Sequence, residues 1–235
     1  MMTSGIVVPP IFQSFSVKAF FTTKMSGSSK ETVSKMADVP LNNIYLPVQR
    51  HTDKTLVLDY DFEPKIADAV ITNRKGILIG VQVADCVPVL LYDMKKHVVG
   101  AVHAGWRGAA AEILRNTIKA MTERFCSLPG DILVAIGPAI RGCCYGVGYE
   151  VIEAVEKVTS SEFGVKSSKD YIIRKGEKYC LDLPTANKYQ AISSGVKTEN
   201  IWVSDECTFC LPEKYYSYRY AKGTTGRQCG FIGIV

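Results

Sequence analysis

The sequence is poor in histidine. Its 235 residues include only three, His51, His97 and His103. A multicopper oxidase needs a blue-copper site together with a three-copper cluster rich in imidazole, and three histidines suffice for one such site alone. The sequence therefore favours a single-metal centre over a complete multicopper oxidase.

Long apolar runs and blocks of like charge are also missing. No stretch of about 18 apolar residues occurs, so no transmembrane helix is expected, and the N-terminus lacks the basic segment of a signal peptide. The net charge of +5 contains no run of five like charges. It gives no indication of a nucleic-acid partner but suits a small anionic substrate such as phosphate. We expect a cytoplasmic protein that binds neither membrane nor nucleic acid.

The composition is that of a globular protein. Hydrophobic residues make up 47% and charged residues 22% of the chain. Its eight cysteines lie mostly in apolar runs and, without an export signal, are interpreted as reduced thiols. No repeat or linker divides the sequence, so residues 1–235 are predicted to form one mixed α/β domain, with residues 1–47 its least regular part.

Strands outnumber helices in the predicted order of elements. Apolar runs bounded by turn residues predict strands, and apolar residues at helical spacing predict helices. The predicted strands cover residues 15–23, 46–58, 69–72, 76–83, 87–92, 98–103, 131–136, 201–203, 216–220 and 231–235, with a hairpin over 171–183. The predicted helices cover residues 108–125, 150–157 and 185–193, and residues 24–35 are predicted to be a loop.

Two candidate metal ligands stand at the ends of predicted strands, where active sites of α/β domains often lie. His103 ends an apolar strand just before a predicted helix, and Cys86 precedes another strand. A turn near residue 95 would place them side by side, whereas His51 must come from elsewhere. Two imidazoles and a thiolate suit a zinc site with an open fourth position. They also suit a copper site, a metal-free Cys–His nucleophile or ordinary core packing.

Three arginines and one aspartate are candidates for binding substrate or phosphate. Arg107 lies at a predicted helix start, where backbone N–H groups attract anions, although a structural ion pair explains it as well. Asp85 either hydrogen-bonds a ligand, orients a metal-bound histidine or caps a turn. Arg219 and Arg227, close to tyrosines, suit either a flat polar ligand or strand packing.

The other paired cysteines are interpreted as structural. Cys143 and Cys144 are adjacent, an arrangement that rarely binds one metal. Cys207 and Cys210 form a Cys-x-x-Cys motif with no evident second pair, and no helix start is predicted that would lower the thiol pKa for a redox role. All four are therefore predicted to serve packing.

Taken together, several segments resemble the YfiH family, also called the laccase-domain or polyphenol-oxidase family. The most specific are Ala-Asp-Cys-Val-Pro at residues 84–88 and His-Ala-Gly-Trp-Arg-Gly at residues 103–108. Further matching segments are Ile-Gly-Pro-Ala-Ile at 136–140, Cys-Cys-Tyr at 143–145, Asp-Leu at 182–183, Cys-Thr at 207–208, Ser-Tyr-Arg at 217–219 and Gly-Arg-Gln at 226–228. The resemblance covers roughly residues 48–235.

The resemblance implies a fold, a site and a function. The fold is a layered, mixed α/β fold similar to the deamidase domain of cytotoxic necrotizing factor, and the metal ligands and catalytic residues are His51, Cys86 and His103. Family members are described as zinc enzymes that phosphorolyse adenosine, inosine and methylthioadenosine and deaminate adenosine. The expected partners are thus a purine nucleoside and phosphate. Copper-dependent polyphenol oxidation and the editing of peptidoglycan precursors by an amidase are the alternatives that the family offers.

The chain departs from the family pattern in three places. Residues 24–47 are shorter than, and different from, the family's Gly-Val-Ser and Ser-Leu-Asn-Leu-Gly stretches. Thr52 follows His51 where glycine is common, and Gly146 stands where the family tends to carry glutamate. These departures leave the three predicted ligands in place and are expected to alter the part of the pocket that the N-terminal region supplies.

Overall fold

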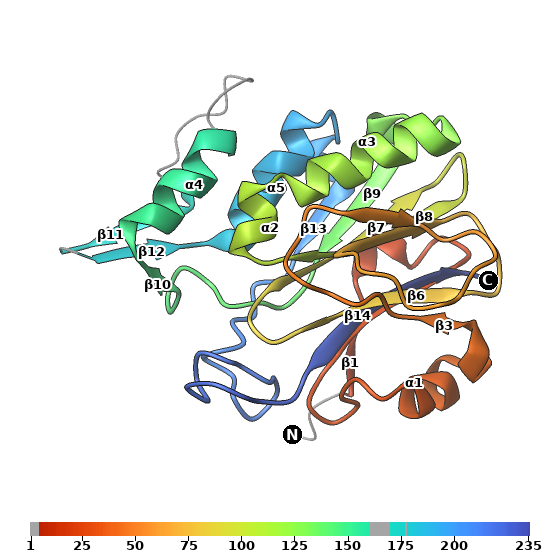
Figure 1. The fold of residues 1–235 in the computed structure, drawn as a ribbon, viewed down its shortest axis with the longest axis horizontal. Coiled ribbons are helices and arrows are strands. Elements are labelled where there is room, and N and C mark those ends of the chain that lie inside the picture. Colours follow the sequence, from red (N-terminus) through yellow and green to blue (C-terminus); the bar gives the residue numbers. More distant parts are fainter. Residues whose placement is uncertain (1–4, 160–169, 177) are drawn as a thin grey trace.

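Two β-sheets stacked face to face form the centre of the structure, a computed structural model that describes residues 5–159, 170–176 and 178–235 (Figure 1). One sheet has the order β1 (Ile6–Val7), β2 (Val17–Thr22), β14 (Gln228–Ile234), β6 (Leu78–Val83) and β3 (Ile44–Tyr45). The other has the order β13 (Ile201–Val203), β9 (Ile132–Ile136), β7 (Val87–Asp93), β8 (Val98–Ala104), β5 (Ala69–Thr72) and β4 (Thr55–Val57).

The central strands are apolar along their whole length because both of their faces are buried. In β7, Val89 and Leu91 pack toward the helices, whereas Leu90 and Tyr92 pack between the two sheets. This alternation follows from the two-residue period of a strand. The layer between the sheets also contains Phe21 of the five-stranded sheet, so the two sheets share one apolar core.

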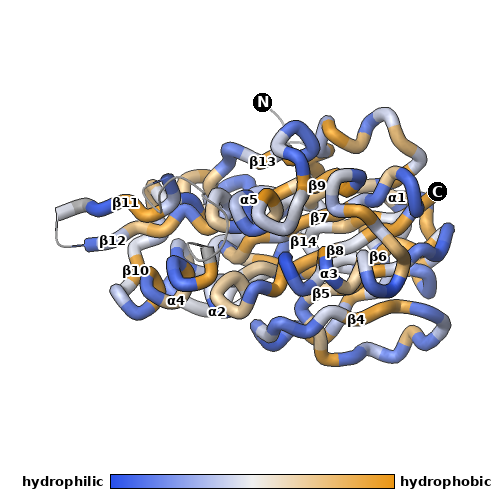
Figure 2. The backbone as a smooth tube through the Cα atoms, turned by 90° about the horizontal axis from the view of Figure 1, so that it is seen from above, coloured by the Kyte–Doolittle hydropathy of each residue, from blue (hydrophilic) through white to orange (hydrophobic). Residues whose placement is uncertain are grey.

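Helices cover the outer faces of both sheets (Figure 1). Those on the six-stranded sheet are α2 (Trp106–Ala110), α3 (Ile113–Phe125), α4 (Tyr149–Thr159) and α5 (Leu183–Ser193). Helix α1 (Lys30–Ala37) covers the five-stranded sheet. A small sheet of β10 (Gly146–Val147), β12 (Lys178–Leu181) and β11 (Ile172–Lys175) extends beside α4. Figure 2 shows the apolar strands inside this layered arrangement and polar loops around it.

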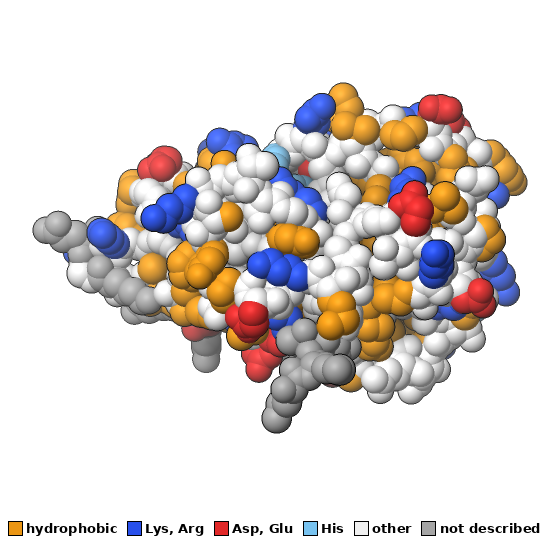
Figure 3. Space-filling model, turned by 90° about the horizontal axis from the view of Figure 1, so that it is seen from below, with side chains coloured by type: hydrophobic (Ala, Val, Ile, Leu, Met, Phe, Trp, Pro, Cys, Tyr) orange, Lys and Arg blue, Asp and Glu red, His pale blue; other side chains and the backbone are white. Residues whose placement is uncertain are grey.

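The described residues also include the short 3-10 helices η1 (Pro10–Phe12), η2 (Leu41–Asn43), η3 (Pro129–Asp131) and η5 (Thr198–Asn200). Among the described residues, no helix has the length and apolar character needed to cross a membrane. On the face seen in Figure 3, Lys and Arg side chains stand singly among uncharged ones instead of forming one basic surface.

The layered α/β class and most of the predicted elements are confirmed. Residues 69–72 and 201–203 form strands with the predicted bounds. Strands β7 and β8 form the predicted hairpin, in which Pro88 pairs with His103. The predicted hairpin at 171–183 corresponds to β11 and β12, although part of its turn, residue 177, lies outside the described residues.

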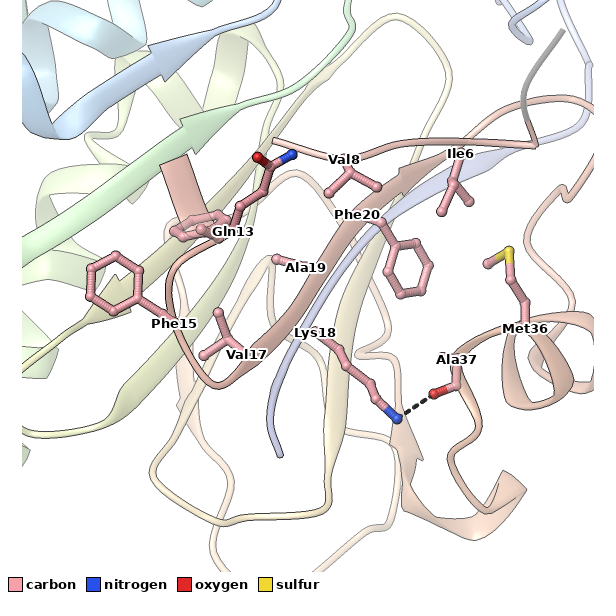
Figure 4. Close-up of a pocket in the computed structure, with 11 residues that line it drawn as sticks. Ile6, Val8, Gln13, Phe15, Val17, Lys18, Ala19, Phe20, Met36 and Ala37 are labelled. Atoms are coloured by element: carbon pink, nitrogen blue, oxygen red, sulfur yellow. Dashed lines mark hydrogen bonds between the residues drawn. The ribbon is translucent and has the colours of Figure 1, made fainter. Parts of the chain in front are cut away.

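The predicted loop over residues 24–35 is confirmed for residues 24–29, of which 24–28 form turns, and wrong from Lys30 onward, where α1 begins. Ser29 caps this helix by accepting a hydrogen bond from the Thr32 N–H. Val33 and Ala37, four residues apart, bury one face against the sheet. The polar composition of the segment concealed this short amphipathic pattern. Lys18 also donates to the Ala37 carbonyl at 2.6 Å, which satisfies the end of the helix (Figure 4).

Three further predictions of elements need correction. The predicted helix over 108–125 is interrupted at Glu112, whose left-handed conformation (φ 59°) separates α2 from α3. The predicted strand over 46–58 is mostly a loop, with only β4 at its end. The predicted strand over 216–220 is a series of turns, because the Gln228 side chain occupies the Tyr216 N–H and carbonyl that a neighbouring strand would need.

A groove lies between the N-terminal segment, β2 and α1 (Figure 4). Apolar side chains such as Ile6, Phe20 and Met36 line it. None of the predicted site residues is among its described lining residues. The candidate site is therefore found elsewhere, at one edge of the six-stranded sheet.

Candidate metal centre

Strand directions gather segments that are far apart in the sequence at this edge. Because β8 and β9 both run antiparallel to β7, the carboxyl ends of β8 and β9 lie beside the amino end of β7. The amino ends of β4 and β5 lie there too, since β5 is antiparallel to β8 and parallel to β4. The loops before β4, β5 and β7 and after β8 and β9 therefore meet at one place.

The three predicted ligands come together at this edge. The ligand atoms of His51, Cys86 and His103 all lie within 4.8 Å of one another. Cys86 Sγ is 3.9 Å from His51 Nε2, and the two imidazole rings stand edge to face with their centroids 4.8 Å apart. His103 is buried, Cys86 is half-buried and His51 is exposed, so the cluster opens to solvent on the His51 side.

A buried carboxylate, Asp68, organises the cluster. It lies just before β5 and has no solvent exposure. Its Oδ1 is 2.8 Å from His103 Nδ1, which leaves His103 Nε2 for a metal ion. The same carboxylate accepts hydrogen bonds from the backbone N–H groups of Arg50, His51 and Thr52 and from the Thr52 hydroxyl, at 2.6–3.1 Å. Asp68 thus fixes both histidines at once.

The loop that carries His51 is held on its other side by Gln49. The Gln49 amide donates to the Gln82 carbonyl and accepts from the Gln82 N–H, both at 2.8 Å, and so extends the pairing of β6. These contacts hold His51 in a left-handed conformation (φ 58°), which is uncommon for a residue other than glycine. Thr52, where the family tends to carry glycine, adds the hydroxyl bond to Asp68 that glycine could not make.

The space at the cluster is shaped by Gly105, which precedes α2. A Cβ atom at this position would lie 3.0 Å from Cys86 Sγ and 3.1 Å from His51 Cδ2. Its φ of −71° is open to any residue, so close approach rather than backbone geometry requires glycine here. The donor set and the space left for it fit a zinc ion with three protein ligands.

The ligands strongly influence one another's ionisation. Burial favours the neutral thiol of Cys86, but the adjacent His103 and His51 outweigh it and lower the thiol pKa to about 6. Burial likewise opposes charge on His103, yet Cys86 and Asp68 raise its pKa to about 9. Asp68 is itself buried, and hydrogen bonds from His103, Thr52 and Arg50 hold its pKa well below the usual range. Such an environment stabilises positive charge at the centre of the cluster.

Asp85, a predicted ligand-binding residue, is occupied by contacts within the protein. Its Oδ1 accepts a hydrogen bond from the Thr208 hydroxyl at 2.6 Å and its Oδ2 from the Arg219 N–H at 2.7 Å. It is buried and adopts a left-handed conformation (φ 80°) directly before Cys86. Asp85 therefore joins the C-terminal loops to the cluster, and the carboxylate that orients His103 is Asp68.

Two of the predicted arginines, Arg219 and Arg107, interact electrostatically with Tyr145, which also interacts with Cys86 of the cluster. Burial, together with the Cys86 thiolate, raises the pKa of Tyr145 to about 12, against the opposing charges of Arg219 and Arg107. The Arg219 guanidinium lies over the Tyr145 ring, 5.1 Å from its centroid, and donates to the Gly146 carbonyl. Arg107 is exposed on α2 and lies over the ring of its neighbour Trp106.

Arg227, by contrast, contacts its own loop. Its guanidinium donates to the carbonyls of Thr225 and Gly226 at 2.8 and 3.0 Å. The described contacts of this side chain are with the chain around it, so the structure gives Arg227 a local role. His97 is an exposed turn residue between β7 and β8, and its Nδ1 lies 2.8 Å from the Tyr92 hydroxyl.

A second group of metal-binding side chains lies nearby. The thiols of Cys143, Cys144, Cys207 and Cys210 all lie within 4.8 Å of one another, and we refer to them as the four-cysteine cluster. The sequence alone provided no second pair for the Cys-x-x-Cys motif, and the fold supplies one from the loop after β9. The prediction that these residues serve packing is therefore wrong for the two exposed thiols, Cys143 and Cys210.

One known protein family matches most of the chain. The family described as multi-copper polyphenol oxidoreductase laccase matches residues 19–235. The chain belongs to this family. The match begins at residue 19, well before the sequence resemblance at residue 48, so β2 and α1 are part of the family's domain.

Two relatives with names of a different kind are also similar to the chain. Purine nucleoside phosphorylase YlmD of Bacillus subtilis (strain 168) is 37% identical over 177 residues, which cover 75% of this chain and 62% of that protein. The matched region thus spans less than two thirds of that relative. Adenosine deaminase RL5, from an unknown prokaryotic organism, is 33% identical over 215 residues, covering 86% of this chain and 79% of that protein.

The fold is similar over its full length to a solved structure. The crystal structure of the Bacillus licheniformis hypothetical protein YfiH matches with a TM-score of 0.89 at 27% identity, covering 100% of this chain and 98% of that one. The layered α/β fold expected of the YfiH family is thereby confirmed.

Sequence reasoning missed Asp68, Gln82 and Thr208, all of which position the site. Their roles depend on long-range contacts that no local motif encodes. A signal was available for Asp68, a lone acidic residue directly before an apolar strand, since such a charge is rarely buried unless it is paired.

Proposed function

We propose that the protein is a zinc-dependent purine nucleoside enzyme that phosphorolyses adenosine, inosine and methylthioadenosine and also deaminates adenosine. The His51–Cys86–His103 cluster is its proposed catalytic centre. The observation that carries the proposal is the cluster itself: three ligand atoms within 4.8 Å of one another, one of them set by Asp68. The names of the relatives, which include a purine nucleoside phosphorylase and an adenosine deaminase, support the substrate class.

When bound, zinc supplies Lewis acidity and a water molecule of lowered pKa at its open position. The chain's contribution is to hold the ligands ready. Asp68 engages Nδ1 of His103, so that this imidazole presents its Nε2, and it holds the His51 loop so that the His51 Nε2 lies beside Cys86 Sγ. Gly105 leaves the space between Cys86 and His51 open.

The residues around the cluster suit a purine nucleoside and phosphate. Tyr145 is half-buried, with its ring already stacked under the Arg219 guanidinium, and offers an apolar surface with a hydroxyl. Arg107 brings a second guanidinium from α2, a group whose fork of donors matches phosphate. In phosphorolysis these cations would hold phosphate against the ribose carbon while the base leaves. In deamination water replaces the amino group at C6 of adenosine and ammonia leaves.

The test separates the two reactions by the presence of phosphate. Zinc-loaded protein is incubated with adenosine or inosine, with and without phosphate, and the products are resolved by chromatography. We expect inosine from adenosine in either buffer, and free base with ribose 1-phosphate only when phosphate is present. Cys86→Ala should lose both activities. Cys126→Ala should retain them, because Cys126 is exposed and belongs neither to the His51–Cys86–His103 cluster nor to the four-cysteine cluster.

Absence of turnover of adenosine and inosine by the zinc-loaded protein would reject the proposal. A second candidate, copper-dependent oxidation of phenols, is favoured by the description of the matched family and by a donor set that copper also accepts. Copper-loaded protein that oxidises a phenol, together with zinc-loaded protein inert toward nucleosides, would favour this candidate. Activity on peptidoglycan precursors that survives chelation would instead indicate an amidase with Cys86 as nucleophile.

A further inference from the structure

We propose that the four-cysteine cluster is a second metal site, which binds one zinc ion through four thiolates. Its ligands come from two loops at the same edge of the six-stranded sheet. Cys143 and Cys144 follow β9, and Cys207 and Cys210 follow β13. Because β9 and β13 are parallel neighbours, their carboxyl ends deliver the two pairs to one place.

The spacing of the sulfur atoms fits a single ion. In a tetrahedral zinc site with Zn–S distances of about 2.3 Å, neighbouring sulfur atoms lie about 3.8 Å apart. Cys143 Sγ lies 3.7 Å and Cys144 Sγ 3.3 Å from Cys210 Sγ, and all four sulfur atoms lie within 4.8 Å of one another. From these separations, shifts of up to about 1 Å bring the four sulfur atoms to the tetrahedral spacing.

The backbone around Cys207 is already arranged for a thiolate. The Arg141 backbone N–H donates a hydrogen bond to Cys207 Sγ at 3.4 Å. Backbone N–H groups directed at a ligand sulfur stabilise its negative charge, which a purely apolar packing role does not require.

Burial distinguishes these thiols from the core cysteines. Cys229 is fully buried in the five-stranded sheet, as expected of a cysteine that serves packing. Cys143 and Cys210 are exposed and still converge on the buried Cys207. A converging, partly exposed set of four thiols gives an ion both a complete set of ligands and a path of entry.

Binding requires no oxidant. Zinc replaces the protons of four thiols, which pass to solvent, and the sulfur atoms keep their oxidation state. The ion would join the loop after β9 to the loop after β13, beside the existing contact of Ala139 with Cys207. Tyr145 directly follows one ligand, and Thr208, which donates to Asp85, directly follows another. The second site would thus brace two segments that border the His51–Cys86–His103 cluster.

The test counts zinc per chain in protein purified under reducing conditions and dialysed against zinc-free buffer. We expect two equivalents in the unaltered protein, and one in the double variant Cys143→Ser/Cys210→Ser, whose two side chains are exposed and whose replacement should leave the fold intact. Cys86→Ala should also bind one, and Cys126→Ser should bind two. Reconstitution with cobalt should give a strong sulfur-to-metal absorption that persists in Cys86→Ala and falls steeply in the double variant, where the Cys86 thiolate of the other cluster is the remaining bound thiolate.

Two results would overturn the proposal. One is an unchanged metal content in the double variant when circular dichroism shows native secondary structure. The other is a Cys144–Cys210 disulfide, found by mass spectrometry in reduced preparations that contain no second metal. Either result leaves the proposed nucleoside activity untouched, because that activity depends on Cys86 and not on these four cysteines.

Discussion

Replacing Asp68 with Asn tests whether one buried carboxylate assembles the His51–Cys86–His103 cluster. The carboxylate accepts hydrogen bonds from five donors: the N–H groups of residues 50, 51 and 52, the Thr52 hydroxyl and His103 Nδ1. An amide has one acceptor oxygen, and its NH₂ group would face N–H donors in place of the other. At least two buried donors would therefore lose their acceptor.

The expected cost follows from these contacts. Each unsatisfied buried donor costs about 1–3 kcal/mol, and removing one partner of a buried charged pair costs about 3–5 kcal/mol in total. We expect the free energy of unfolding to fall by about 3–5 kcal/mol. Because Asp68 orients His103 and holds the His51 loop, zinc affinity at the cluster should also fall, by about 10- to 100-fold.

The assay combines urea unfolding with a competitive zinc titration in the Cys143→Ser/Cys210→Ser background, so that one site titrates. Asp93→Asn is the matched control, since Asp93 is equally buried and accepts from the Lys95 and Lys96 N–H groups at the opposite end of β7. It should lower stability and leave zinc affinity unchanged. Zinc affinity within twofold of the unaltered protein in Asp68→Asn would refute the reasoning, because the cluster would then assemble without the carboxylate.

Four other expectations can be tested alongside. Gly105→Ala should weaken zinc binding about tenfold in a zinc titration, with little loss of helix, because the new Cβ would press on Cys86 Sγ. Gly130→Ala is the control and should leave zinc binding unchanged, because its Cβ would lie 3.5 Å from its nearest neighbour. Arg219→Ala should raise the KM for nucleoside or phosphate about tenfold at constant zinc content, because the loss of roughly one charged contact weakens binding by about that factor. An unchanged KM would argue against a role of Arg219 in binding. Asp182 is buried, yet its hydrogen bonds and its ion pair with Arg141 lower its pKa. Its carboxylate therefore stabilises the fold above the unfolded-state pKa near 3.8, and this stabilisation is lost as the pH falls through the lower pKa of the folded state. In urea unfolding between pH 3 and 7, the free energy of unfolding of Asp182→Asn should fall less steeply toward acid pH than that of the unaltered protein. Chelation should abolish activity while circular dichroism remains native, and a chelated protein that unfolds outright would indicate a structural metal instead.

The three residues of the His51–Cys86–His103 cluster were easier to predict from the sequence than the residues that hold them in place. Cys86 and His103 could be paired from local patterns, since a hairpin about residue 95 brings them together. His51 could be placed only through the family resemblance, because its loop has no regular pattern and is held by contacts with Asp68. Hydrogen bonds between residues tens of positions apart leave no periodic signal.

The four-cysteine cluster was even harder to predict from the sequence. Adjacent cysteines and an isolated Cys-x-x-Cys motif gave no indication of a common site, because only the parallel pairing of β9 with β13 joins them. Helix α1 was missed for a different reason. Its two buried residues, Val33 and Ala37, are too few to be distinguished from a polar loop without the sheet that they cover.

The position of β14 has a consequence for how the chain is made. This strand, residues 228–234, is the last of the described strands, yet it lies in the middle of the five-stranded sheet between β2 and β6. During synthesis β2 and β6 therefore emerge from the ribosome with no strand between them, and their facing edges stay unpaired until residues 228–234 have been made. A chain that stops before residue 228 would therefore contain every ligand of both clusters but lack the central strand of one sheet.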